Sequence, residues 1–156
     1  MIEIIQAEAD EQIEAARNLF REYEAWLGLN LCFQDFDREV ADLPGKYAAP
    51  EGRLFLAVSQ EKSVGCIALR KLDVRICEMK RLFVREDFRG FGVGNKLIKR
   101  LIDEARLIGY EKMRLDTYPP KMAKAAKLYE SHGFGEIPAY YHNPYGKTLY
   151  MEKKLK

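Results

Sequence analysis

The residues best suited to chemistry form a glycine loop, Arg89-Gly90-Phe91-Gly92-Val93-Gly94, between an expected strand that ends at Val84 and an expected helix. Glycine tolerates positive φ and lets a ligand approach the backbone closely. The first turn of a helix presents N–H groups without intrahelical acceptors at the positive end of the helix dipole. The loop therefore predicts an anion site, most naturally for phosphate, and the alternative is a glycine-rich turn without a ligand.

The spacing of the loop decides which phosphate-binding motifs it can represent. The dinucleotide fingerprint G-x-G-x-x-G, counted from Gly90, requires a third glycine where the chain has Asn95. The pattern G-x-x-x-x-G-K-[ST] fails because only three residues separate Gly90 from Gly94, and Leu97 stands where Ser or Thr belongs. A nucleotide-dependent kinase or dehydrogenase therefore rests on glycine content alone.

The elements that must position the loop follow from hydrophobic periodicity. Strands are expected over residues 53–58, 64–72 and 76–84, joined by short polar turns as an antiparallel meander. After the loop, a helix that ends at Gly109 is predicted from apolar residues at helical spacing: Val93, Leu97, Ile98, Leu101, Ile102, Ala105 and Ile108. A strand over 112–117, a helical stripe from Met122 that ends at Gly133, and a last strand over about 148–155 follow. This order implies a right-handed crossover and a parallel strand pair in a mixed α/β sheet with helices on both faces.

The N-terminal third is less regular. A helix is expected from Ile13, Ala16, Phe20, Tyr23 and Leu27, with Asp10 as its N-cap and Gly28 as its end. Residues 29–52 predict a short helix inside a long connection, a kind of segment that often forms a binding surface.

Length and composition bound the class of protein. The 156 residues are expected to form one domain, and 47% hydrophobic residues supply a core. The 26 basic and 24 acidic residues leave a net charge of only +2, which argues against a nucleic-acid binder. No apolar run approaches the length of a membrane span, and the N-terminus lacks a signal-peptide pattern. The three cysteines, Cys32, Cys66 and Cys77, lack C-x-x-C spacing, which predicts free thiols in a reducing, cytoplasmic compartment.

Two motifs together resemble the GNAT superfamily of acetyl-CoA-dependent N-acetyltransferases. The loop matches R-x-x-G-x-G through Arg89, Gly92 and Gly94, and the preceding Glu78-Met79-Lys80-Arg81-Leu82-Phe83-Val84 is similar to the family's central strand. Downstream, Ala125, Leu128, Tyr129, Gly133 and Phe134 match A-x-x-L-Y-x-x-x-G-F. The resemblance covers roughly residues 53–156. It implies a mixed, mostly antiparallel sheet of about six to seven strands with a parallel central pair and flanking helices.

The same resemblance implies how coenzyme A is held. The loop amides would grip the pyrophosphate, and pantetheine would lie along the central strand like an extra strand. The residues so assigned to acetyl-CoA are Leu82, Phe83, Val84, Arg89, Gly90, Phe91, Gly92, Val93, Gly94 and Asn95. One position departs from the family, because Met122 stands where an asparagine often contacts the cofactor.

Acetyl transfer to an amine needs a base for the amine proton, a stabilised oxyanion and an acid for the thiolate. Glu78 matches the family position of the base, and Tyr129 matches the tyrosine that protonates the coenzyme sulfur. Glu78 could instead point outward or pair with Lys80 or Arg81, and Tyr129 could be a core aromatic. A backbone N–H near Leu82 or Phe83 would meet the oxyanion.

Other reactive side chains are assigned lesser roles. Cys66 and Cys77 lie in apolar strand contexts and are expected to pack rather than act as nucleophiles. His132 is expected at a helix end on the surface. No cluster of His, Cys or carboxylates has metal-ligand spacing, so no metal is expected.

The acceptor is expected to be a primary amine of a small molecule or peptide, acetylated by direct attack within a ternary complex. Trp26, Tyr118, Tyr141 and His142 are its candidate binding residues, with Tyr23, Phe33 and Tyr140 as further aromatics, although all could be core or loop residues. The alternative function is a non-catalytic acyl-CoA-binding sensor module. A homodimer is also expected, as is common in the superfamily.

Overall fold

A computed structural model describes residues 1–31 and 34–156, so Cys32 and Phe33 lie outside the described residues. Seven strands form one sheet in the order β1-β2-β3-β4-β5-β7-β6. All neighbours are antiparallel except β4 and β5, which are parallel. The strands are β1 (Glu3–Gln6), β2 (Arg53–Ser59), β3 (Lys62–Asp73), β4 (Ile76–Val84), β5 (Lys112–Thr117), β6 (Gly135–Ile137) and β7 (Leu149–Lys154). The predicted mixed sheet with its parallel pair is confirmed.

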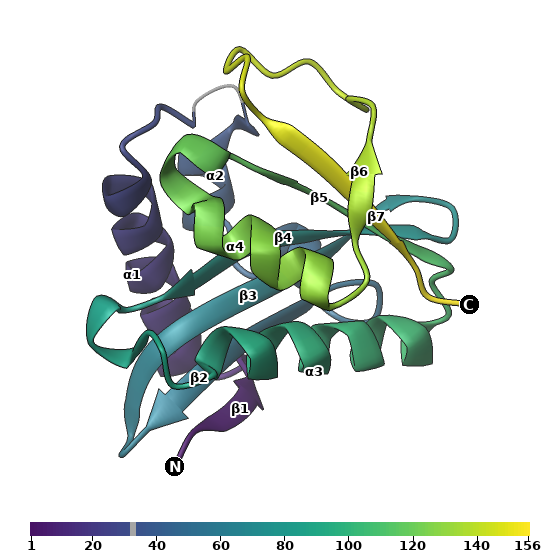
Figure 1. The fold of residues 1–156 in the computed structure, drawn as a ribbon. Helices are drawn as coiled ribbons and strands as arrows, with labels where there is room; N and C mark the ends of the chain where they lie inside the picture. The colour runs from purple at the N-terminus through teal and green to yellow at the C-terminus, as the bar shows by residue number, and fades with distance from the viewer. Residues whose placement is uncertain (32–33) are drawn as a thin grey trace.

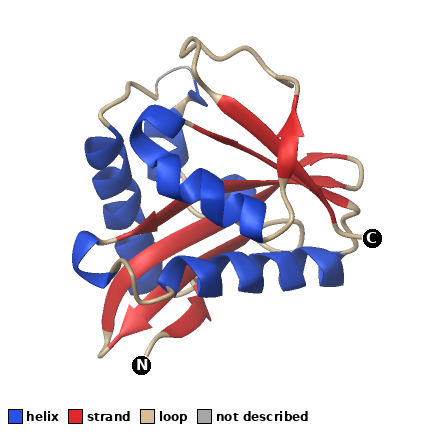
Figure 2. Ribbon diagram, viewed as in Figure 1, coloured by secondary structure: helices blue, strands red, loops and turns tan. Residues whose placement is uncertain are grey.

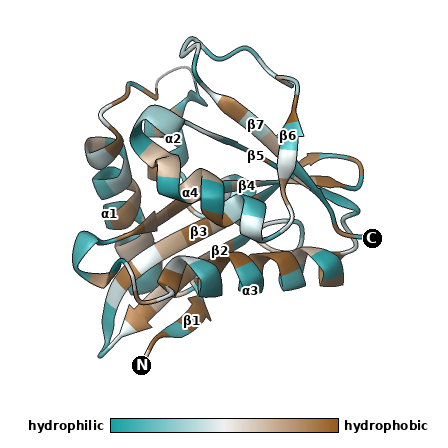
Figure 3. Cartoon of the chain, viewed as in Figure 1, coloured by the Kyte–Doolittle hydropathy of each residue, from teal (hydrophilic) through white to brown (hydrophobic). Residues whose placement is uncertain are grey.

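Helices cover both faces of the sheet (Figures 1 and 2). One face packs on α1 (Asp10–Leu27) and α2 (Phe36–Ala41), and the other on α3 (Val93–Ile108) and α4 (Pro119–Ser131). Short 3-10 turns lie at Gly45–Tyr47 and Glu86–Phe88. Apolar and polar residues alternate along α3 in Figure 3, as expected for a helix with one buried side. In the described ranges, no helix combines the length and apolar character that a membrane span requires.

Two helix starts differ from the sequence prediction. Asp10 is the first residue of α1 rather than its N-cap, which is Ala9. The Gln12 side chain accepts hydrogen bonds from the backbone N–H groups of Glu8 and Ala9 and so caps the helix. α4 begins at Pro119, three residues before Met122, because proline is well suited to the first turn of a helix. Met122 itself has φ −127° and ψ 41°, which kinks the helix. Gly28, with φ 71°, ends α1 as predicted.

Candidate active site

The parallel strands β4 and β5 separate partway along their length. Their pairing runs from Ile76↔Lys112 to Glu78↔Arg114, although β5 continues to pair with β7 as far as Thr117. A register shift between β3 and β4, with Arg81 at φ 60°, marks a bulge at this point. The second half of β4 therefore faces away from β5 with backbone groups that an extended, amide-bearing ligand can pair with.

A cavity opens where the two strands diverge. Its walls come from β4, β5, α1 and α4, and its lining residues are Tyr23, Met79, Lys80, Arg81, Leu82, Leu115, Asp116, Met122 and Tyr129. Four of these side chains carry groups that can exchange or hold protons, namely Tyr23, Lys80, Asp116 and Tyr129. The cavity therefore brings chemistry-bearing groups to the end of the parallel strands, where ligands bind in many α/β sheets.

Tyr129 enters this cavity from α4. Its ring is buried and packs edge-to-face on Phe134, with 6.0 Å between ring centroids. Within the described residues, its hydroxyl has no hydrogen-bond partner. Burial raises the pKa of Tyr129, and the charge of Asp116 adds to this effect, so the hydroxyl stays protonated at neutral pH. A protonated hydroxyl that lines a cavity can donate a proton to a group bound there, and the ring also packs in the core.

Glu78 is buried on the opposite side of β4 from the α3 core. Its carboxylate accepts a hydrogen bond from Arg70 Nε at 2.8 Å and another from the Tyr140 hydroxyl at 2.5 Å. Burial acts to raise the pKa of Glu78, but Lys80, Arg70 and Tyr140 together lower it, so the carboxylate is ionised at neutral pH. The hydrogen-bond partners of Glu78 are thus Arg70 and Tyr140, whereas Lys80 lies 4.0 Å away, and Glu78 does not line the cavity itself.

Lys80 and Asp116 form the polar floor of the cavity. Lys80 Nζ donates to Gln34 Oε1 at 3.1 Å and lies 4.0 Å from both Glu78 Oε1 and Asp116 Oδ2. Asp116 Oδ2 also accepts the Tyr141 hydroxyl at 2.8 Å. Sequence reasoning assigned neither Lys80 nor Asp116 to the site. Their position in the sequence could have indicated the site, because both residues follow the last paired residues of two adjacent parallel strands, where ligands often bind.

The segment 138–148, between β6 and β7, places tyrosine rings next to Lys80 and Asp116. Tyr140, Tyr141 and Tyr150 contact one another edge-to-face at 5.3 to 5.5 Å between centroids. Tyr145 packs against Tyr118 at the start of α4, at 6.0 Å. Tyr118 and Tyr141, two of the residues expected to contact the acceptor, both lie beside this segment or within it, whereas His142 is exposed.

Trp26 lies apart from these tyrosines, beside Phe83 near the end of β4. Its ring packs on Phe83 at 6.1 Å, and the Arg89 guanidinium stacks over it at 4.8 Å. Arg89 Nε also donates to the Val84 carbonyl at 2.8 Å. Trp26 therefore supports the glycine loop through Arg89 and is not brought together with the tyrosines of 138–148.

The glycine loop forms the N-terminus of α3. Gly90 and Gly92 have φ of 85° and 78°, and a Cβ at either position would meet no atom within 4 Å. Their backbone conformation favours glycine, and the space above them is open. The first helical bond of α3 runs from Lys96 N–H to the Gly92 carbonyl, so the N–H groups of the first turn have no intrahelical acceptor. This geometry is suited to an anion.

The remaining predicted cofactor residues surround this loop in different ways. Asn95 Oδ1 lies 2.8 Å from His132 Nε2 at the end of α4, so both side chains tie the loop to that helix. Phe91 is 72% exposed, whereas Val93 is buried. Leu82 and Val84 pack on the α3 side of the sheet and Phe83 on the α1 side.

The two described cysteines, Cys66 and Cys77, are buried. Burial raises the pKa of the Cys66 thiol far above its usual value and that of Cys77 to about 12. Thiolates, not thiols, are nucleophiles, so neither cysteine is prepared to carry an acetyl group.

Comparison with known proteins identifies the class that carries this fold and site. The model of the acetyltransferase (GNAT) family matches residues 12–134. The chain therefore belongs to this family and is an acetyltransferase, and the family's acyl donor is acetyl-CoA. The resemblance inferred from the loop and helix motifs is confirmed.

Individual relatives agree with this assignment. The chain is 34% identical to an uncharacterized N-acetyltransferase of Schizosaccharomyces pombe, covering 99% of this chain and 95% of that protein. It is 39% identical over 101 residues to the N-acetylaspartate synthetase of Danio rerio, covering 64% of this chain and 36% of that protein. A solved GNAT acetyltransferase of Staphylococcus aureus has the same fold, with a TM-score of 0.83, 21% identity and full coverage of both chains.

Proposed function

We propose that this protein transfers the acetyl group of acetyl-CoA to the primary amine of a small molecule or peptide by direct attack in a ternary complex. The observation that carries the proposal is the splay of β4 from β5, where a cavity is lined by Tyr129, together with the glycine loop that follows β4 in the chain. A thioester placed there has a proton donor on one side. The unpaired edge of β4 is on the other side.

The residues present fit coenzyme A. The first-turn amides of α3, with Gly90 and Gly92 giving close access, would hold the pyrophosphate. Leu82 and Val84 would contact the pantetheine arm along the free edge of β4. Met122 lines the cavity where a cofactor-binding asparagine is often found, so one polar contact is replaced by an apolar one. Bound acetyl-CoA would supply an activated acetyl thioester.

The protons then move between named atoms. The amine nitrogen forms a bond to the acetyl carbon while the carbon–sulfur bond breaks. The Tyr129 hydroxyl would give its proton to the departing sulfur, which is consistent with its burial and with its lack of a hydrogen-bond partner within the described residues. Glu78 receives the amine proton through the Tyr140 hydroxyl that donates to it at 2.5 Å. Asp116, which lines the cavity, is the rival carboxylate for this role.

Several observations support a small amine as acceptor. Tyr141 donates to Asp116 and packs on Tyr150, so aromatic rings border the polar residues of the cavity. The similarity to an N-acetylaspartate synthetase, whose name gives an amino acid as the acetylated product, also favours a small acceptor. A cytoplasmic location, a homodimer and one domain over residues 1–156 stay predictions.

Calorimetric titration of the pure protein with acetyl-CoA tests the proposal first. Gly92→Glu places a carboxylate in the phosphate site and is expected to abolish micromolar binding. Gly109→Glu is the matched control, because Gly109 also has positive φ with open space and lies at the far end of the same helix. Equal binding by both variants, or none by the wild-type protein, would contradict the proposal. If the protein binds acetyl-CoA but releases no coenzyme A with any amine tested, the non-catalytic acyl-CoA-binding sensor is favoured.

A further inference from the structure

On the α1 face of the sheet, three arginines and Lys80 lie around the end of the parallel strand pair, and Lys80 differs from the arginines. The three arginines each donate to a carboxylate oxygen at 2.8 Å, in the pairs Arg70–Glu78, Arg81–Glu39 and Arg114–Glu152. Within the described residues, these carboxylates are already committed to an arginine. The remaining cation is Lys80.

Lys80 has no close carboxylate of its own in the described part of the chain. Its Nζ donates to the neutral amide oxygen of Gln34, and the nearest carboxylate oxygens, on Glu78 and Asp116, are each 4.0 Å away. The side chain is only 9% exposed. An ammonium has three donors, and among residues 1–31 and 34–156 that of Lys80 has a single neutral acceptor at hydrogen-bond distance, so it has capacity for an anionic ligand. Burial and the charge of Arg81 lower the pKa of Lys80, an effect that a bound anion would offset.

Asp116, which lies beside Lys80, indicates that the ligand also carries a positively charged or hydrogen-bond-donating group. Asp116 lines the same cavity, and its carboxylate can accept hydrogen bonds besides the one from Tyr141. A cation and an anion side by side are complementary to a molecule that carries an amine next to a carboxylate. Since Tyr129 lines this cavity too, such a molecule would hold its amine close to the thioester.

From this arrangement we infer that the acceptor is an amino acid, with its carboxylate on Lys80 Nζ and its amine beside Asp116. The inference rests on the proposed acetyl transfer to an amine and narrows the acceptor class. Lys80 is here a specificity-determining residue, which recognises the carboxylate.

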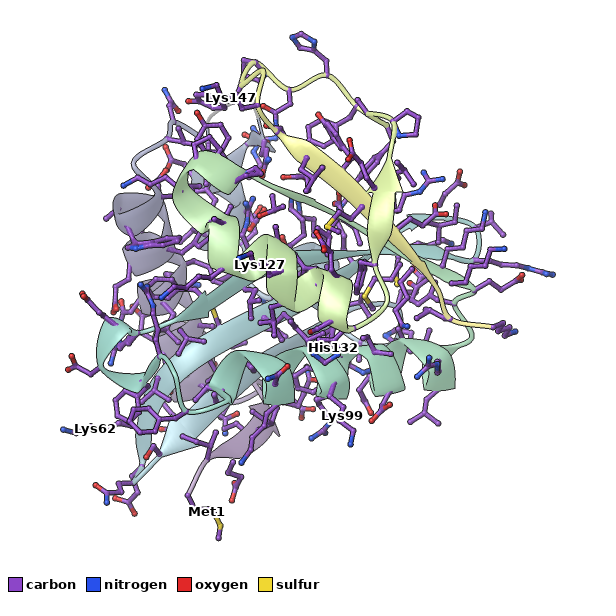
Figure 4. The ribbon with its side chains drawn as sticks, in the orientation of Figure 1. Met1, Lys62, Lys99, Lys127, His132 and Lys147 are labelled. Carbon is purple, nitrogen blue, oxygen red and sulfur yellow. The ribbon has the colours of Figure 1, made fainter. Side chains whose placement is uncertain are left out.

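The test compares each common L-amino acid with its α-carboxamide as acceptor, by coenzyme A release. For the best acceptor, wild-type kcat/KM is expected to be at least about tenfold higher for the acid, because the amide loses a charge-assisted hydrogen bond. Lys80→Met is expected to reduce this acid-to-amide ratio at least about tenfold. Lys99→Met, on the outer surface of α3 in Figure 4, is the matched control and keeps the wild-type ratio.

Binding gives a second readout that does not depend on turnover. The N-acetyl derivative of the best acid is titrated into protein saturated with coenzyme A, and it is expected to bind the wild type at least about tenfold tighter than Lys80→Met. If no amine is turned over, the N-acetyl derivatives of all the acids are titrated instead. Preferential binding would then support the carboxylate site while refuting transfer, and no binding would overturn both.

Two outcomes refute the inference while leaving the proposed function intact. The first is equal use of acids and amides by the wild-type protein, which itself needs no variant. The second is an equal loss of activity toward both in a folded Lys80→Met protein. Lys80 would then be a bridge between Glu78 and Asp116 rather than a ligand for the acceptor.

Discussion

The ion pair between Glu39 and Arg81 ties α2 to the bulge of β4, and its removal is expected to destabilise the protein in a pH-dependent way. Arg81 Nε and Nη2 donate to the two Glu39 oxygens at 2.8 and 3.0 Å, and Lys46 Nζ lies 3.2 Å from the same carboxylate. The Arg81 and Glu39 side chains are only 2% and 3% exposed. Because Arg81 also lines the cavity, this pair supports the site itself.

The size of the effect follows from the pKa of Glu39. Burial acts to raise this pKa, but Arg81, Lys46 and Lys80 overcome burial and lower it from 4.5 to about 2. At 1.36 kcal/mol for each unit of pKa, the difference corresponds to about 3 kcal/mol of folding free energy. A lowered pKa stabilises the folded state fully above pH 4.5, and this stability is lost as the pH falls toward 2. By a pH of about 3, roughly 2 kcal/mol of it is gone.

Urea denaturation of the wild type and Glu39→Gln at neutral pH and near pH 3 measures this term. Gln cannot titrate, so the stability difference between the two proteins is expected to shrink by about 2 kcal/mol at the lower pH. Glu22→Gln removes an exposed pair with Arg85, both side chains 40% exposed, and serves as the control with a far smaller change. A difference that is independent of pH would refute the reasoning.

If Glu39→Gln fails to fold, the pKa of Glu39 can still be measured in the wild-type protein. Removing one partner of a buried ion pair typically costs 3 to 5 kcal/mol, so about that loss is possible for Glu39→Gln at neutral pH. The Glu39 carboxyl resonance of the wild-type protein can then be titrated by NMR. A midpoint near 4.5 rather than near 2 would contradict the assignment.

Two further predictions concern the proton transfers. Tyr129→Phe is expected to lower kcat about 10- to 100-fold with little change in thermal stability, since the hydroxyl has no partner within the described residues; unchanged kcat would exclude it as the acid. Glu78→Gln is expected to reduce kcat/KM at least about tenfold while acetyl-CoA affinity is kept, with Asp116→Asn as its comparison. If Asp116→Asn alone removes activity, Asp116 is the base. Because the pKa of Glu78 lies below its usual range, the wild-type rate should follow the ionisation of the amine between neutral and alkaline pH.

Local patterns in the sequence predicted the central part of the fold well. The expected bounds of β4 and β5 agree with the structure, and α3 begins and ends where its apolar stripe does. β5 alternates apolar and polar residues, and α3 has helical spacing with glycine at both caps, so local sequence is enough to predict them. β1 and β6 have four and three residues and exist as strands through pairing with β2 and β7, a long-range contact that periodicity does not reveal.

The candidate site was predictable in its loop but not in its polar contacts. Gly90 and Gly92 signalled their positive φ through residue type alone. The hydrogen-bond partners of Glu78 could not be predicted in the same way, because Arg70 comes from a neighbouring strand and Tyr140 from a loop 62 residues away. Which carboxylate meets which cation depends on sheet register, and register is set by the whole core.

The bulge in β4 explains why the site has an arginine and a lysine side by side. In a regular strand, consecutive residues point to opposite faces, so one of Lys80 and Arg81 would enter the α3 core. The extra residue at Arg81 lets both reach the α1 side, where Arg81 contacts Glu39 and Lys80 contacts Gln34. It also restores the alternation that sends Leu82 to the α3 side and Phe83 under Arg89. One inserted position thus accounts for two buried cations on one face of β4, of which Lys80 is the one proposed to meet the carboxylate of the acceptor.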